Sequence, residues 1–225
     1  AFLAMKITFI NEIADLCETV GANVQEVAKG VGLDNRFGGK FLHAGPGYGG
    51  SCFPKDTLAL TRTAQEYDAP LRLIETVVEV NDARKRAMAS KVIEACGGDV
   101  NGKTVAILGV TFKPNTDDMR DAPSLEIIPA LQKAGATVRA FDPAGTVEAE
   151  KLLQNVEFVS GPYFCAEGAD VLVIITEWNE FRALDMKRLK STMKSPILVD
   201  LRNIYTLEEA TNAGFAYTSV GRPNG

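Results

Sequence analysis

The first twenty residues carry apolar side chains at steps of three and four. This spacing matches the 3.6-residue period of a helix and predicts a helical segment with one apolar stripe. The stripe consists of Phe2, Met5, Phe9, Ile13, Leu16 and Val20. No Ser, Thr, Asp, Asn or Pro precedes it to cap the first turn. We therefore expect the sequence to open inside a helix, with its apolar face bare and part of the protein missing upstream.

Three more helices are predicted in the first hundred residues. A capping-box-like start predicts a helix over 23–32. A short helix at 57–67 is expected to follow a glycine-rich, irregular segment at 34–56. The pattern of 71–96 then predicts a helix about 39 Å long at 1.5 Å per residue. Such a helix could bridge two domains or line a dimer seam, although one long core helix fits the pattern equally well.

The pattern changes after residue 102. Short apolar runs rich in β-branched residues replace the helical stripes, as in the buried strands of a parallel sheet. The runs are TVAILGV, ATVRAFD, ADVLVIIT and PILVDL. Helices are expected between them at 124–134, 146–154 and 185–194, the first interrupted by Pro129. This alternation predicts a Rossmann-like parallel sheet with helices on both faces.

The predicted fold class is α/β with two domains. Residues 1–96 form an N-terminal all-helical region that ends in the long connecting helix. Residues 97–225 form the parallel α/β sheet domain. The boundary is placed in GGDVN, where the helical periodicity stops and the strand-like runs begin.

Composition narrows the classes of function. With 225 residues, 46% of them hydrophobic, the chain can bury a substantial core. A net charge of −5 argues against nonspecific nucleic-acid binding, and no apolar run approaches the roughly 20 residues of a membrane helix. Four cysteines without CxxC spacing and a single histidine predict neither a disulfide framework nor a metal site. No signal peptide is recognised, so a reducing cytoplasm is expected.

The first predicted strand runs into the loop TFKPNTDD, at the edge where open α/β sheets bind ligands. Only Gly109 is present instead of GxGxxG, so we do not expect a dinucleotide pyrophosphate on this backbone. Lys113 and Arg120 could meet phosphate charge, and Phe112 could stack on a base or wall a sugar. Arg202 follows another strand at the same edge. A solvated loop with scattered charges accounts for the loop about as well.

Residues 45–56, GPGYGGSCFPKD, place four glycines before a cysteine. Glycines permit positive φ and let a backbone pass close to a ligand. The ammonium of Lys55 would favour the nucleophilic thiolate of Cys52, and the carboxylate of Asp56 could hold or activate a water. A lone cysteine is more often inert and buried, and the two interpretations are about equally supported here. His43 has no evident partner for protease-like catalysis.

The chain resembles the UDP-glucose 6-dehydrogenases of the UDP-glucose/GDP-mannose dehydrogenase family over its whole length. The resemblance rests on AFLAMKITFINEIADLCE, DNRFGGKFLHAGPGYGGSCFPKD, ILGVTFKPNTDDMRDAPS, TEWNEF and VDLRN, in this order. Several long motifs in the right order are more specific than any single one. The FPKD ending favours UDP-glucose over the UDP-N-acetylmannosamine relatives. GDP-mannose 6-dehydrogenases remain an alternative.

The resemblance implies an NAD-dependent, two-step oxidation of UDP-glucose to UDP-glucuronate. The cysteine matching Cys52 would attack the C6 aldehyde to give a thiohemiacetal, which is oxidised to a thioester and then hydrolysed. The aspartate matching Asp56 would assist proton transfer and water activation. A thiolate for covalent capture and a nearby carboxylate for hydrolysis suit this chemistry.

The resemblance also assigns binding roles by position. Lys55 and Arg120 would face NAD. Arg36 would reach into the site of a neighbouring subunit, in a homodimer formed through the central helices. The residues expected to hold UDP-glucose are Arg36, Phe41, Leu42, His43, Ala44, Gly45, Gly49, Phe112, Lys113 and Arg202. Residues 1–96 would then be the dimerisation region with the catalytic cysteine loop, and 97–225 the UDP-sugar-binding domain.

The chain departs from the family pattern at its start. The family carries an N-terminal Rossmann domain with GxGxxG, and a catalytic lysine and asparagine that would fall immediately before Ala1. We therefore expect these 225 residues to bind the UDP-sugar without oxidising it. The alternative from another class is a noncatalytic module for UDP-sugar binding and dimerisation.

Overall fold

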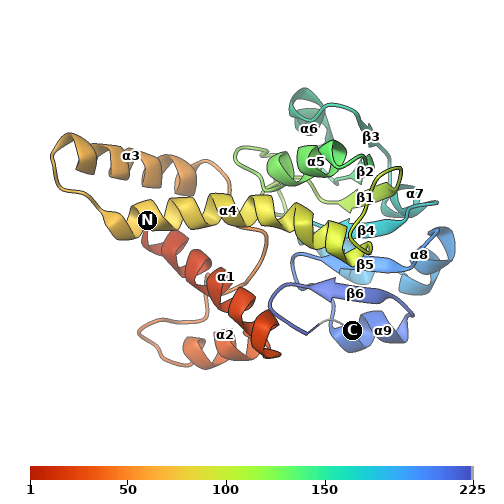
Figure 1. Cartoon of the computed structure of the whole chain (residues 1–225), viewed down its shortest axis with the longest axis horizontal. Coiled ribbons are helices and arrows are strands. Elements are labelled where there is room, and N and C mark those ends of the chain that lie inside the picture. The colour runs from red at the N-terminus through yellow and green to blue at the C-terminus, as the bar shows by residue number, and fades with distance from the viewer. Residues whose placement is uncertain (224–225) are drawn as a thin grey trace.

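The computed structural model describes residues 1–223, which form helices followed by one parallel sheet with helices on both sides (Figure 1). The helices of the first part are α1 (Phe2–Val20), α2 (Val24–Gly32), α3 (Cys52–Glu66) and α4 (Arg72–Ala95). An irregular segment, 33–51, joins α2 to α3 and contains most of the glycine-rich stretch. The predicted α/β fold, helical first and Rossmann-like second, is confirmed.

The sheet has the strand order β3-β2-β1-β4-β5-β6, and all neighbouring strands are parallel. Its strands are β1 (Thr104–Leu108), β2 (Thr137–Phe141), β3 (Val156–Phe158), β4 (Val171–Ile174), β5 (Ile197–Asp200) and β6 (Ala216–Ser219). The chain moves from β1 to one edge and then returns to β4, which makes β1 and β4 the switch point. Ligands of open α/β sheets bind beyond the carboxyl ends of the strands at such a point.

Helices cover both faces of this sheet. They are α5 (Ser124–Lys133), α6 (Thr146–Leu152), α7 (Pro162–Ala166), α8 (Met186–Thr192) and α9 (Leu207–Asn212), with a short 3₁₀ helix, η1 (Asn179–Ala183). Successive residues of β1 face opposite layers: Val105 and Ile107 pack in one buried cluster, and Ala106 and Leu108 in the other. This is the two-residue alternation of a strand buried on both faces.

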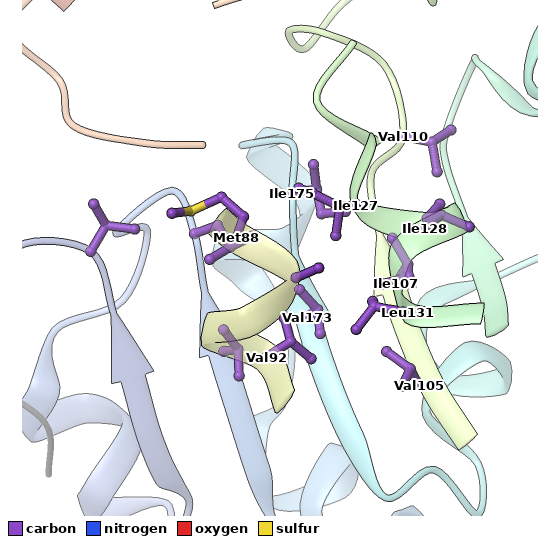
Figure 2. Close-up of a cluster of buried hydrophobic side chains, with 14 of the residues drawn as sticks. Met88, Val92, Val105, Ile107, Val110, Ile127, Ile128, Leu131, Val173 and Ile175 are labelled. Atoms are coloured by element: carbon purple, nitrogen blue, oxygen red, sulfur yellow. The ribbon is translucent and has the colours of Figure 1, made fainter. Parts of the chain in front are cut away.

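The long helix α4 belongs to both parts of the molecule. Figure 1 shows it running from α1 and α3 onto the sheet, and Figure 2 shows Met88 and Val92 of α4 against Val173 of β4 and against side chains of β1 and α5. Nearer its start, Val77 packs with Ala4 of α1 and with Tyr48. A helix anchored in two hydrophobic clusters holds segment 33–51 in a fixed position relative to the sheet. The predicted bridging role of the helix at 71–96 is therefore observed, with Arg72 as its first residue.

The start of α3 differs from the sequence prediction. The predicted helix begins at Thr57, whereas α3 begins at Cys52 and includes Pro54 in its first turn. The prediction is wrong because glycine and proline, which are typical of loops, lie directly before and inside the first turn of this helix. Proline is tolerated in the first turn, where the backbone N–H that it lacks has no helical partner. Cys52, Lys55 and Asp56 are therefore residues of a helix.

Two strands were not predicted. Strand β3 has three residues, too few to give a periodic signal. Strand β6 alternates exposed and buried positions and contains Tyr217 as its large buried residue. Both lie at the outer edges of the sheet, where one side of the strand lacks a neighbour and the sequence is less uniformly apolar.

The apolar stripe of α1 lies on its exposed face. Phe2, Phe9, Leu16 and Val20 have 65%, 45%, 56% and 65% of their surface exposed. The opposite face is buried through Ile10 and through small or polar side chains, namely Ala4, Thr8, Asn11, Ala14 and Cys17. Small residues let the helix approach the irregular segment and α4 closely. None of the helices described in residues 1–223 is both long and apolar enough to cross a bilayer.

Candidate functional site

A cavity of about 380 Å³ lies where the irregular segment meets the carboxyl edge of the sheet. The irregular segment contributes one wall and the loop after β1 contributes the other. The lining residues are Ile7, Asn11, Lys40, Phe41, His43, Gly45, Gly47, Tyr48, Gly49, Phe53, Phe112, Lys113, Glu177 and Arg202. Seven of the predicted ligand-binding residues are thus brought together: Phe41, His43, Gly45, Gly49, Phe112, Lys113 and Arg202.

A second cavity of about 780 Å³ adjoins the first. The two share the lining residues His43, Glu177 and Arg202, so they adjoin at these side chains. The second cavity extends toward α2 and also includes the predicted residues Leu42 and Ala44. A site of this size and shape can accommodate an elongated ligand with chemically distinct ends.

Two cations that follow strands of the sheet line the first cavity, together with Lys40 of the irregular segment and the carboxylate of Glu177. Lys113 lies above the ring of Phe112, with its ammonium nitrogen 5.3 Å from the ring centroid. Arg202 is largely buried and donates to the carbonyl oxygens of Ile175 and Phe112. The carboxylate of Glu177 lies 3.0 Å from Nε of Arg202. The guanidinium is therefore oriented by two loops of the sheet, as a phosphate or carboxylate ligand requires.

Cys52 is the first residue of α3, and neither it nor Lys55 or Asp56 is among the residues that line the two cavities. Its side chain is exposed, and the next residue, Phe53, lines the cavity and packs on Phe41 and Tyr48. The unpaired backbone N–H groups of a helix N-terminus favour negative charge at such a position. Lys55 and Asp56 follow at three and four residues, so all three side chains project from one face of α3. The sulfur, ammonium and carboxylate are thus brought to one surface.

The glycines of segment 45–50 serve close packing against the protein itself. A Cβ on Gly49 would overlap the carbonyl of Asp121, and one on Gly50 would lie 2.7 Å from the ring of Phe112. Gly50 also donates its N–H to the carbonyl of Arg120 at 2.7 Å. The loop can therefore run between α4 and the β1–α5 connection, and its residues still line the cavity.

The β1 loop does not have the geometry of a dinucleotide-binding turn. Gly109 has φ +82°, and a Cβ there would lie 2.5 Å from Cβ of Thr176, so this glycine permits packing between loops. Asp142, at the end of β2, is buried and accepts hydrogen bonds from Val110, Thr111 and Trp178. In dinucleotide-binding folds an acid near this position binds the ribose hydroxyls of the cofactor. The carboxylate of Asp142 instead accepts hydrogen bonds from the protein itself. NAD therefore does not fit this turn.

Arg120 and Arg36 are both exposed and both paired locally. Arg120 binds Asp118, and this hydrogen bond lowers the pKa of the Asp118 carboxyl, so the pair stays ionised throughout the neutral range. The backbone of Arg120 lies close to the start of α3, because its carbonyl oxygen accepts the N–H of Gly50, two residues before Cys52. Arg36 pairs with Asp34 and lies outside the residues that line the two cavities.

The structure adds residues that the sequence reasoning did not select. Glu177 and Asn203 follow β4 and β5 at the same sheet edge as Arg202, so the position rule for parallel sheets could have identified them. Asn11 and Tyr48 also line the first cavity. The sequence does not distinguish Asn11 as a site residue, because it lies inside a helical pattern. Tyr48 is likewise not distinguished, because it lies among the glycines of segment 45–50.

Comparison with known proteins identifies the family. Residues 1–83 match the central domain of the UDP-glucose/GDP-mannose dehydrogenase family, and residues 106–207 match the UDP binding domain of the same family. The chain belongs to this family. The expected resemblance is therefore confirmed over both parts of the molecule.

Individual relatives agree with this assignment. The chain is 67% identical to a UDP-glucose 6-dehydrogenase of Rhizobium meliloti, over 100% of this chain and 51% of that protein. It is 48% identical to a UDP-glucose 6-dehydrogenase of Bacillus subtilis, over 99% of this chain and 48% of that protein. A UDP-glucose dehydrogenase structure from Pyrobaculum islandicum superposes with a TM-score of 0.86 at 33% identity, covering 98% of this chain and 49% of the other. The chain thus spans about half the length of these relatives.

Proposed function

We propose that this chain carries the UDP-sugar site and the nucleophile of a UDP-glucose 6-dehydrogenase, which oxidises UDP-glucose to UDP-glucuronate. The observation that carries the proposal is the cavity lined by Phe112, Lys113 and Arg202, whose lining also includes Phe53, the residue after Cys52. The two cations suit a diphosphate, and the thiol suits covalent capture of a C6 aldehyde. The proposal that this sugar nucleotide is UDP-glucose rests on the names of the relatives.

The proposed reaction has two oxidations and one hydrolysis. The C6 alcohol first loses a hydride and a proton to give the aldehyde. The thiolate of Cys52 adds to the aldehyde carbon, and the oxyanion that forms takes up a proton to give a thiohemiacetal. The thiohemiacetal then loses that proton and a second hydride to become a thioester. Asp56, one helical turn from Cys52 on the same face, directs the water that cleaves the thioester to the carboxylate and frees the thiol.

NAD is the proposed oxidant, and when bound it accepts one hydride in each of the two oxidations. Lys55 and Arg120 are the residues of this chain that would contact it, since both are exposed near the start of α3. The described residues offer no dinucleotide turn of their own, as the β1 loop shows. A polypeptide limited to these 225 residues should therefore bind UDP-glucose without producing NADH.

The active form is proposed to be a homodimer formed through the central helices. The exposed stripe of Phe2, Phe9, Leu16 and Val20 on α1 supports this proposal, because a second copy would remove it from water. Arg36 is exposed, and it could extend to a neighbouring subunit if a contact there replaced its ion pair with Asp34. All four cysteines are unpaired, which fits a cytoplasmic location.

Calorimetric titration of the 225-residue chain tests the proposal. UDP-glucose should bind, and Lys113→Ala should weaken binding by about 1.5–3 kcal/mol, roughly ten- to hundredfold, through loss of a charge-assisted contact. Lys187→Ala removes an exposed lysine on α8 and serves as the matched control, with unchanged affinity expected. GDP-mannose should bind more weakly than UDP-glucose.

Unchanged affinity in Lys113→Ala would place the nucleotide elsewhere. Preference for GDP-mannose would favour the alternative within the family. If UDP-glucose binds but does not protect Cys52 from alkylation, the noncatalytic module would be favoured. NADH formation by the 225-residue chain would contradict the expectation that it cannot seat the oxidant.

A further inference from the structure

Segment 45–48 is held by three buried polar side chains from two helices. Gly45 donates its N–H to Oδ1 of Asn11 at 2.9 Å and accepts at its carbonyl oxygen from Nε of Arg84 at 2.9 Å. Tyr48 donates its N–H to Oδ1 of Asn81 at 2.8 Å, and Nδ2 of Asn81 donates back to the Tyr48 carbonyl at 3.2 Å. Asn11 comes from α1, whereas Asn81 and Arg84 come from α4.

Asn81 makes the most specific of these contacts. Its side chain is 3% exposed, and its amide offers one acceptor and one donor to the N–H and C=O of a single residue. Gly47, the residue before Tyr48, has φ +113°, and a Cβ there would lie 2.9 Å from Oδ1 of Asn81. The backbone of 47–48 is thus shaped to fit this amide.

Through Tyr48, the contact with Asn81 connects to Phe53, the residue that follows Cys52. The ring of Tyr48 packs edge-on against Phe53, with centroids 5.9 Å apart, and Phe53 follows Cys52 in the first turn of α3. Tyr48, Gly47 and Phe53 also line the cavity. A displacement of the Tyr48 backbone would therefore move the cavity wall and the aromatic contact that fixes the start of α3.

We propose that Asn81 is a positioning residue for the covalent step, one that sets the sugar end of the cavity against Cys52. The inference rests on the proposed function. Lys113 and Arg202, which are proposed to contact the diphosphate, line the same cavity but belong to other segments and make no hydrogen bond to Asn81. Substitution of Asn81 should therefore leave the affinity for UDP nearly unchanged and should alter the position of the sugar relative to Cys52.

The experiment compares two quantities in the 225-residue chain. One is the affinity for UDP, measured by calorimetry. The other is the protection of Cys52, measured as the ratio of its iodoacetamide alkylation rates without and with saturating UDP-glucose. Asn81→Asp keeps the acceptor for Tyr48 N–H and loses the donor to its carbonyl. Asn81→Ala loses both, and Glu79→Gln, an exposed position one half-turn earlier on α4, is the matched control.

For Asn81→Asp we expect UDP affinity within about threefold of the unsubstituted chain and a protection ratio at least about fivefold smaller. Asn81→Ala should show the same separation, and Glu79→Gln should change neither quantity. Full protection in a folded Asn81→Asp variant would overturn the inference, and so would parallel loss of UDP affinity and protection, which a general structural role produces. Absence of protection in the unsubstituted chain would instead overturn the proposed function and this inference with it.

Discussion

Cys52 differs from the other three cysteines in its surroundings. Burial raises the pKa of Cys165 to about 12, and burial also raises the pKa of Cys96. Cys17 is buried in the core between α1 and its neighbours. Cys52 alone is exposed among the four, at the N-terminal end of a helix and on the same face as Lys55. Thiol chemistry requires the thiolate and access to it, so the difference between these residues predicts which one reacts.

Alkylation across pH 7–9 checks this difference. Iodoacetamide should add a single group per native chain, because a raised pKa leaves Cys96 and Cys165 mostly protonated in this range and burial shields Cys17. Intact mass measures the number of groups added. The Cys52→Ser variant should take up none while it remains folded. A second adduct that appears before unfolding would show that another thiol is accessible.

The elements around the site are joined by close backbone approach. Segment 45–50 passes between α4 and the β1–α5 connection, where side chains larger than hydrogen have no room at several positions. The same connection carries Phe112 and Lys113 into the cavity. The glycines thus let one segment from each half of the chain pack closely together where both line the cavity.

A methyl group at Gly49 tests this packing. Gly49→Ala should lower the free energy of unfolding by about 1–3 kcal/mol, because its Cβ would overlap the Asp121 carbonyl and press on Phe112. Gly30→Ala is the control: this glycine is helical, with open space around its Cβ position, and should be neutral or stabilising by up to about 1 kcal/mol. Urea denaturation measures both. Equal effects at the two positions would contradict the close approach.

At the scale of the whole molecule, α4 joins the helical part to the sheet, and Glu18 ties both to the end of the chain. Its carboxylate binds Lys91 of α4 and accepts the N–H of Gly221, each at 2.7 Å. The site lies between these parts, with one wall from each. Neither part alone contains both Cys52 and Arg202.

Much of this organisation could be predicted from the sequence. The helical first part, the parallel sheet and the helix at 71–96 follow from periodicity, which reports burial along one element. The cavity residues Phe112, Lys113 and Arg202 were selected because strand ends meet at one edge of a parallel sheet.

The remaining features depend on contacts between distant segments. The start of α3 at Cys52 is one, since the glycine and proline around it suggested a loop. The pairing of Asn81 with Tyr48 is another, because it joins residues 33 positions apart in the sequence. No local pattern in the sequence reports such a contact.

The alkylation rate of Cys52 with and without UDP-glucose tests most directly whether this cysteine belongs to the proposed UDP-sugar site. The rate should fall by about tenfold or more at saturating UDP-glucose, because a sugar held against Phe53 would cover the exposed sulfur of the preceding residue. UDP, which lacks the sugar, should protect much less, and GDP-mannose should protect weakly at the same concentration. An unchanged rate with UDP-glucose, at a concentration where calorimetry shows the site to be filled, would contradict the account.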